Sequence, residues 1–163
     1  MQWHSKKIAQ YGLLTALALV LSYVESLVPA FFAVPGMKLG LTNLVVVVAL
    51  YQMDGKSAFL INVLRIALVS TLFGNGVAFA FSLAGGMLST LGMILLKEKA
   101  KLSAVSVSVA GGILHNVGQI LVAMVVLGTR QIGWYLTILW FSGLVCGALI
   151  GLLSGMVLKR LPR

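Results

Sequence analysis

Acidic residues are nearly absent from this sequence of 163 residues, which contains three of them: Glu25, Asp54 and Glu98. Proteins that handle diphosphates through Mg²⁺ hold the metal with clustered carboxylates, and these three are too far apart in sequence to form such a cluster. The two histidines, His4 and His115, are also far apart, and no pairing of a nucleophile with a base is visible. The sequence therefore predicts no catalytic residue, no metal site and no cofactor, and we do not expect the chain by itself to be an enzyme.

Charged residues of both signs together make up only 9% of the chain, whereas 60% is hydrophobic and the mean hydropathy is +1.07. Soluble domains are about 45–50% apolar and about 25% charged. A soluble chain of this size could not bury so much apolar surface, so the composition predicts an integral membrane protein. The net charge of +9 does not indicate nucleic-acid binding, because the basic residues are scattered between apolar runs and form no basic face.

Cysteine and linker sequences are scarce as well. The single cysteine, Cys146, lies inside an apolar run and has no partner for an intrachain disulfide, so cysteine usage does not indicate a redox compartment. No linker, low-complexity tract or long charge run divides the chain. We expect residues 1–163 to form a single transmembrane domain.

Apolar runs of membrane-spanning length recur along the chain. A spanning helix needs roughly 20 apolar residues, with a range of about 17–25. The runs are continuous, unlike the alternating strands of a barrel, and in lipid a helix satisfies its own backbone groups. We predict an all-α integral membrane bundle of about six transmembrane helices, at approximately 8–28, 41–53, 57–73, 77–96, 104–127 and 134–158.

The first of these runs, which follows Lys6 and Lys7, has the basic start of a signal peptide. Its apolar core is too long for one, and no clear A-x-A cleavage site follows. We interpret this run as the first spanning helix, with cleavage as the alternative.

The distribution of basic residues predicts the orientation. Cytoplasmic loops carry the excess of lysine and arginine in membrane proteins. With the N-terminus inside, only Lys38 and Arg130 lie outside, and the inner set is Lys6, Lys7, Lys56, Lys97, Lys99, Lys101, Lys159, Arg160 and Arg163. Both termini are therefore predicted to be cytoplasmic.

Several polar residues lie in or beside the predicted helices. A charge such as Arg65 at mid-helix costs about 2.5–3.5 kcal/mol on insertion scales, and such residues usually face the bundle interior. At about 1.5 Å per residue, Arg65 and His115 lie at roughly the same depth, and Gln119 shares a helix face with His115. We predict a polar path from the outer surface to the midplane, with the ligand-binding residues Glu25, Lys38, Asn43, Arg65, His115, Asn116 and Gln119.

Arg65 and Lys38 would suit an anionic group, and the amides of Asn116 and Gln119 would orient the ligand. The segment 29–40 is predicted to act as a lid. The alternative interpretation is structural: Arg65 would pair with Glu25, and the polar residues of the fifth helix would satisfy interhelical hydrogen bonds.

Small residues recur at intervals of four, which allows close helix packing. In the first helix they are Gly12 and Ala16, and in the last helix they are Gly143, Gly147, Gly151 and Gly155. Packing inside the bundle is one interpretation, and a docking face for another membrane protein is the other.

The segment Pro35–Asn43, PGMKLGLTN, resembles the P-G-x-K-L-G-L-x-N motif of the heptaprenyl diphosphate synthase component I family, also called the Gx transporter family. Glu25, the isolated Arg65, the glycine-serine stretch 82–89 and the HNVGQ of 115–119 agree with the same family. The resemblance covers nearly the whole chain and implies a multi-pass protein of the bacterial cytoplasmic membrane.

That family is similar in size and six-helix layout to the S-components of energy-coupling factor (ECF) transporters. Those proteins capture a micronutrient from outside and dock on a transmembrane scaffold driven by two ATPase subunits. The resemblance implies that Gly12 and Ala16 would mediate the docking.

Three hypotheses for function follow from the residues and the resemblance. The leading one is an S-component-like protein for uptake of a micronutrient or a molecule related to isoprenoids, quinones or flavins. The alternative is an accessory membrane subunit of heptaprenyl diphosphate synthase, which makes the menaquinone side chain. The third is an assembly scaffold. The chain has no ATPase motif, so active transport would require partners.

Overall fold

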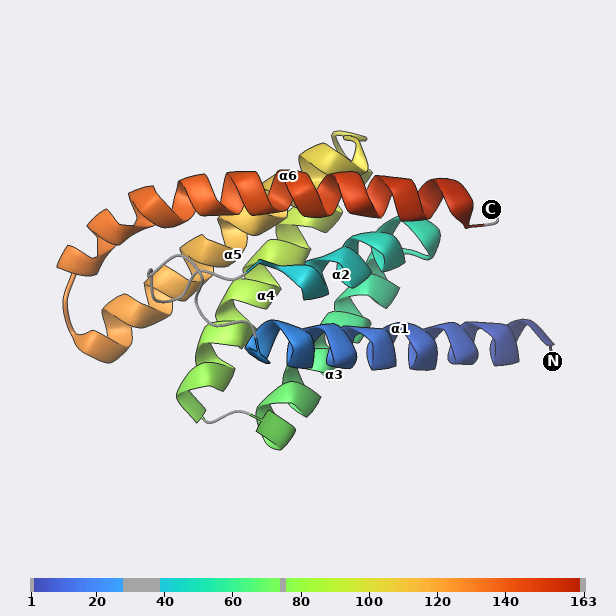
Figure 1. The fold of residues 1–163 in the computed structure, drawn as a ribbon, viewed down its shortest axis with the longest axis horizontal. Helices are drawn as coiled ribbons and strands as arrows, with labels where there is room; N and C mark the ends of the chain where they lie inside the picture. Colours follow the sequence, from blue (N-terminus) through green and yellow to red (C-terminus); the bar gives the residue numbers. More distant parts are fainter. Residues whose placement is uncertain (1, 28–38, 74–75, 162–163) are drawn as a thin grey trace.

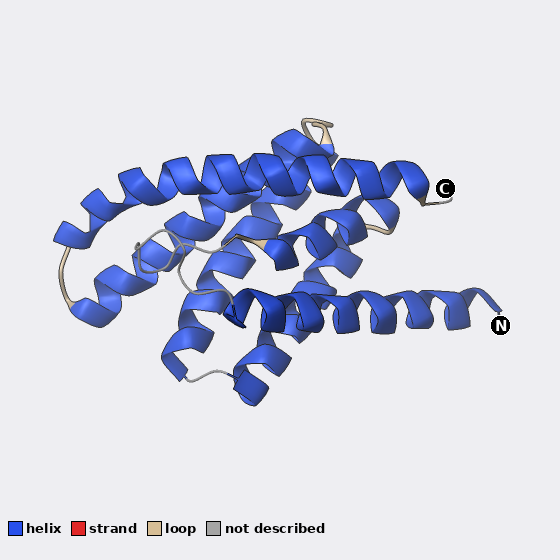
Figure 2. Ribbon diagram, in the orientation of Figure 1, coloured by secondary structure: helices blue, strands red, loops and turns tan. Residues whose placement is uncertain are grey.

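The computed structural model describes residues 2–27, 39–73 and 76–161, and all regular structure in those residues is helical (Figures 1 and 2). The prediction of an all-α fold is therefore confirmed. The elements are α1 (Gln2–Leu27), α2 (Leu41–Gln52), α3 (Gly55–Phe73), α4 (Gly76–Glu98), α5 (Ala104–Leu127), a 3₁₀ helix η1 (Gln131–Tyr135) and α6 (Leu136–Arg160).

Within the described residues, five segments are long and apolar enough to cross a membrane. They are Ser5–Leu27, Gly55–Leu72, Gly76–Glu98, Ala104–Leu127 and Gln131–Arg160. The chain is thus a multi-pass membrane protein. Helix α2 is the sixth apolar helix of the bundle, and its 12 residues reach only about 18 Å, which is less than a bilayer core of about 30 Å.

Helix α2 forms the centre of the bundle. Its run of Val45–Leu50 is buried throughout, and Val45, Val47, Ala49 and Leu50 have no exposed surface. The helix packs against α1, α3, α5 and α6. A helix that is apolar on every side is stable only when neighbours surround it, which here are other helices of the same chain.

Glycines set the close packing of α4, α5 and α6, which lie side by side in Figure 1. A Cβ atom added at Gly147 would lie 2.8 Å from Val109 Cα, and one at Gly151 would lie 2.7 Å from Val105 Cα. Gly143 meets Gly112 in the same way, whereas a Cβ at Gly155 would have nothing within 4 Å. Most of the α6 glycine series therefore packs inside the bundle.

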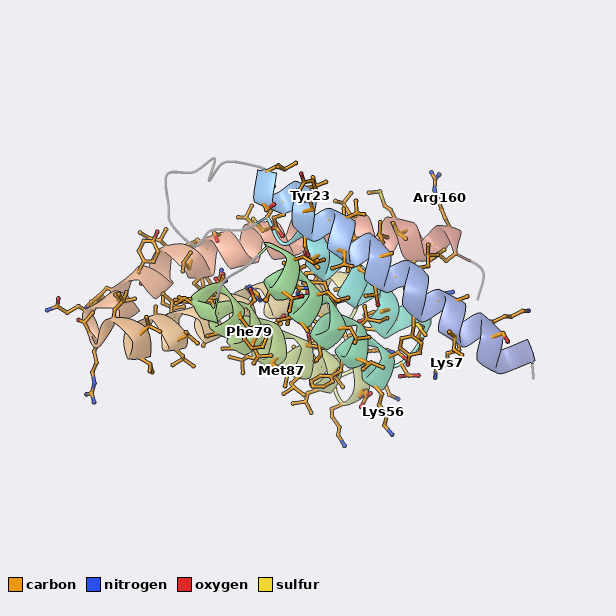
Figure 3. The ribbon with its side chains drawn as sticks, turned by 90° about the horizontal axis from the view of Figure 1, so that it is seen from below. Lys7, Tyr23, Lys56, Phe79, Met87 and Arg160 are labelled. Atoms are coloured by element: carbon orange, nitrogen blue, oxygen red, sulfur yellow. The ribbon has the colours of Figure 1, made fainter. Side chains whose placement is uncertain are left out.

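The end of the molecule where α1 begins and α6 ends also holds the α2–α3 turn. Figure 3 shows Lys7 and Arg160 toward this end, and Lys7 Nζ lies 3.3 Å from Asp54 Oδ2. Lys97 Nζ donates a hydrogen bond of 2.5 Å to Leu50 O, a carbonyl of the last turn of α2. Basic residues that are predicted to be cytoplasmic thus lie at the same end of the molecule. That this end faces the cytoplasm stays a prediction.

Asp54 caps α3, since its Oδ1 accepts a hydrogen bond of 2.7 Å from the Ser57 amide. This bond, more than the neighbouring Lys7, holds the pKa of Asp54 below its ordinary value. The Ser57 hydroxyl in turn lies 2.7 Å from the Tyr11 hydroxyl of α1. The first half of α1 is therefore attached to the start of α3 through polar contacts.

Candidate functional site

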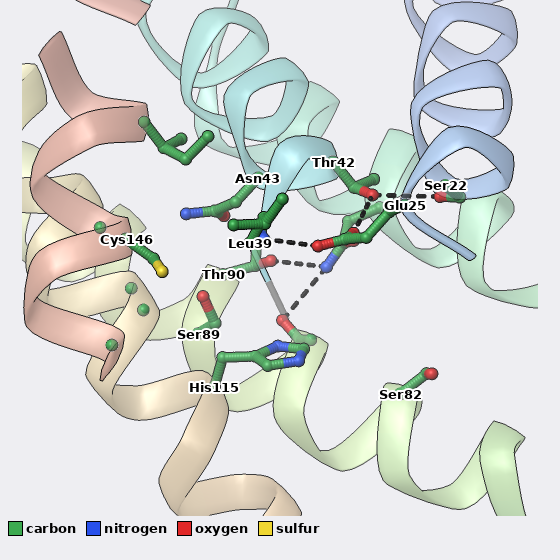
Figure 4. A pocket seen from close by; sticks show the side chains of 18 of the residues that line it. Ser22, Glu25, Leu39, Thr42, Asn43, Ser82, Ser89, Thr90, His115 and Cys146 are labelled. Atoms are coloured by element: carbon green, nitrogen blue, oxygen red, sulfur yellow. Dashed lines mark hydrogen bonds between the residues drawn. The ribbon is translucent and has the colours of Figure 1, made fainter. Parts of the chain in front are cut away.

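A cavity of about 210 Å³ lies within the bundle and is lined by residues from all six α-helices (Figure 4). It extends from the region where α1 ends and α2 begins toward the middle of α3 and α5. The polar side chains on its wall are Ser22, Glu25, Ser26, Thr42, Asn43, Asn62, Arg65, Ser82, Ser89, Thr90, His115 and Asn116. The cavity therefore places polar side chains inside an apolar bundle, next to a larger apolar part of its wall.

Glu25 lies near the end of α1 and points toward the start of α2 (Figure 4). Its Oε1 accepts a hydrogen bond of 2.6 Å from the Gly40 amide, and its Oε2 lies 3.5 Å from the Thr42 hydroxyl. Gly40 precedes α2 with a φ of 76°, a conformation that favours glycine. A carboxylate at this helix N-terminus is stabilised by the free N–H groups and the helix dipole.

Arg65 extends from the middle of α3 into the same cavity. Its Nη2 donates a hydrogen bond of 2.6 Å to Asn62 Oδ1. Its Nε is buried and has no hydrogen-bond partner among the described residues. The Glu25 carboxylate attracts the guanidinium, yet no ion pair joins these two described side chains. The structure thus does not show the simple Arg65–Glu25 pair of the structural alternative.

Asn62, which is not among the predicted site residues, orients Arg65. It is 3% exposed, and its Nδ2 donates to Thr90 Oγ1 at 2.7 Å and to Gly86 O at 3.1 Å. Because both hydrogens of the Asn62 amide bind acceptors on α4, the Asn62 Oδ1 atom is free to accept the hydrogen bond from Arg65. The spacing of three residues within α3 places Asn62 and Arg65 on one helix face, and this could have identified Asn62 from the sequence.

Helix α5 contributes His115 and Asn116. Both line the cavity, and Figure 4 shows the His115 ring near Ser89. Asn116 Nδ2 donates a hydrogen bond of 2.6 Å to Leu139 O, which ties α5 to α6. Asn116 therefore fits both interpretations, since it stabilises the helix pair and borders the cavity.

The remaining predicted residues fall in different places. Asn43 lines the cavity, whereas Gln119 is buried in α5 outside the cavity wall. Lys38 lies outside the described residues, as does most of the predicted lid 29–40. Gly12 and Ala16 lie on an exposed side of α1.

The part of the chain that the structure describes contains no group of three or more histidine, cysteine and acidic residues that could hold a metal ion. The free thiol of Cys146 belongs to the cavity wall instead, where it faces the space shared with Ser89 and His115 (Figure 4). The arrangement is one of hydrogen-bond donors, acceptors and two opposite charges, which suits the binding of a polar small molecule.

Comparison with known proteins identifies the family. The family described as heptaprenyl diphosphate synthase component I matches residues 14–157, which include every helix in whole or in part. Comparisons with curated proteins and with solved structures gave no match. The chain therefore belongs to the heptaprenyl diphosphate synthase component I family.

Proposed function

We propose that this protein is an S-component-like substrate-binding protein that captures a small molecule inside its helix bundle, in the cytoplasmic membrane of a bacterium. The observation that carries the proposal is the cavity with the buried, unpaired Arg65 Nε on its wall. Charged and polar groups inside a membrane protein are costly and usually mark a ligand or ion site. The ligand is a micronutrient or a molecule related to isoprenoids, quinones or flavins.

The size of the cavity favours a small ligand. Pockets for drug-sized molecules measure about 300–1,000 Å³. At about 210 Å³, this cavity suits a smaller molecule or a head group, and it would not enclose a long prenyl chain. Uptake would also require partners, a transmembrane scaffold and ATPase subunits, which would dock on the exposed Gly12 and Ala16 of α1.

Native mass spectrometry of the gently purified chain tests the proposal. A bound small molecule, together with recovery of a scaffold and ATPases, is the expected result. Replacing Gly12 and Ala16 by leucine should remove those partners and leave the fold intact, because a Cβ atom at Gly12 meets nothing within 4 Å. Ala67→Leu, at an exposed position of α3, is the matched control and should keep the partners.

The description of the family favours a second candidate, an accessory membrane subunit of heptaprenyl diphosphate synthase. That function requires purified chain to raise heptaprenyl diphosphate formation when it is added to a soluble synthase subunit. Stimulation of this kind, with no small molecule and no ATPase recovered, would replace the first candidate by the second.

A further inference from the structure

Two opposite charges share one cavity without forming an ion pair. Glu25 on α1, Arg65 on α3 and Cys146 on α6 all line it. Figure 4 shows Glu25 and Cys146 on opposite sides of the space. With histidine neutral, Glu25 and Arg65 are the formally charged side chains among the described residues of the wall.

Each charged group keeps capacity for a further hydrogen bond. A guanidinium has five N–H donors, and Arg65 uses Nη2 on Asn62 while its buried Nε donates to no described residue. Glu25 accepts a short hydrogen bond at Oε1, but the contact of Oε2 with the Thr42 hydroxyl is long, at 3.5 Å. The cavity therefore offers one strong cationic donor and one anionic acceptor.

Charge balance decides which ligand can satisfy both groups. Inside a bilayer, an uncompensated charge is expensive, whereas opposite charges compensate each other. The described side chains of the wall carry no net charge when His115 is neutral, so a ligand with a single charge would leave this part of the occupied cavity charged. A ligand with one negative and one positive group would pair with both Arg65 and Glu25. The net charge of the occupied cavity would then stay at zero.

We propose that the ligand is a small zwitterion, whose anionic group binds the Arg65 guanidinium and whose ammonium group faces Glu25. The inference rests on the proposed function and narrows its range of ligands, because it favours a zwitterionic micronutrient over an isoprenoid or a quinone. Asn62 is a positioning residue here, because its hydrogen bonds to α4 fix the direction of the guanidinium.

The test is affinity selection by mass spectrometry. Purified chain in detergent is mixed at pH 7 with a panel of small metabolites that contains zwitterions, single anions, single cations and neutral molecules. We expect the retained compounds to be zwitterions. Arg65→Gln and Glu25→Gln should each reduce their retention by at least about tenfold, as expected for truncating one partner of a buried charge pair.

Two further variants keep the test decisive. Arg65→Lys retains the charge but lacks the planar fork, so retention should be intermediate even if Arg65→Gln folds poorly. In Glu25→Gln the wall gains a net positive charge, so single anions should gain retention relative to zwitterions. Arg160→Gln, on the exposed last turn of α6, is the control and should change neither class.

The outcomes separate this inference from the proposed function. A different result is that the protein retains neutral or singly charged compounds and that Glu25→Gln leaves their retention unchanged. This result would overturn the zwitterion inference, but the substrate-binding function would stand. If no compound of any class is retained, and none is found bound in the native mass spectrum, the proposed function itself is wrong.

Discussion

Asn62 Oδ1 accepts a hydrogen bond of 2.6 Å from Arg65 Nη2, one turn further along α3. The bond connects the charge in the cavity to α4, because the Asn62 amide also donates to Thr90 and Gly86. A guanidinium that is held in this way needs little reorganisation when a ligand arrives, which reduces the free-energy cost of binding.

Asn62→Ala should therefore weaken both the fold and the site. The change removes the acceptor of a buried charged group and leaves Thr90 without its donor, at a cost of about 1–3 kcal/mol of stability. Thermal unfolding in detergent measures the loss, and native mass spectrometry measures how much bound small molecule remains. Thr71→Ala, at an exposed position of the same helix, should change neither; equal effects of the two variants would contradict the role of Asn62.

Gly147 is predicted to tolerate no side chain. A Cβ atom there would meet Val109 Cα at 2.8 Å and Ser108 O at 2.9 Å, which are backbone atoms that cannot rotate away. Gly147→Ala should destabilise the protein by about 1–3 kcal/mol through overpacking of α5 against α6. Gly155→Ala has open space and the higher helix propensity of alanine, so its unfolding temperature should be unchanged or slightly higher. A similar unfolding temperature for the two variants would refute this packing arrangement.

Asp54 is predicted to give the protein a pH-dependent stability in the acid range. Its pKa is lower in the folded state, chiefly through the Ser57 amide, so the carboxylate favours folding above the unfolded-state pKa. That contribution is lost as the pH falls through the folded-state pKa. Unfolding temperatures should therefore decrease below about pH 4.

Asp54→Asn separates the titration from the helix cap. Asparagine still caps the helix, so stability near pH 7 should change little, whereas the acid-dependent decrease should become smaller. Asp54→Ala removes the cap as well and should cost about 0.5–2 kcal/mol at neutral pH. An Asp54→Asn profile parallel to that of the unaltered protein would assign the acid sensitivity to another group.

Orientation is tested by labelling single cysteines in intact cells, in a Cys146→Ser background. Lys99 follows α4 and Arg130 follows α5, so the two positions lie at opposite ends of helix α5. A cysteine at position 130 should react with an impermeant thiol reagent, and one at position 99 should react only after the cells are opened. Labelling of position 99 from outside would reverse the proposed topology.

The sequence by itself determined the class of the protein and most of its helices. A composition that is 60% hydrophobic and 9% charged leaves the membrane as the only adequate solvent for the chain. The long apolar runs predicted α5 with its observed bounds, Ala104–Leu127, and located the others to within a few residues, except at the start of α1, which begins earlier. The sequence also indicated Glu25, Arg65 and His115 as functional candidates, because polar and charged side chains are unfavourable in lipid unless the protein encloses them.

Only the tertiary structure decided how these residues meet. Apolar content does not distinguish a helix surrounded by lipid from one surrounded by protein, so the central position of the short α2 could not be read from its valines. Whether Arg65 on α3 contacts Glu25 on α1 depends on a separation of a few ångströms between the two helices, which their packing sets. That packing follows from glycine contacts such as Gly147 with Val109, which require the backbones of two helices distant in sequence to be placed side by side.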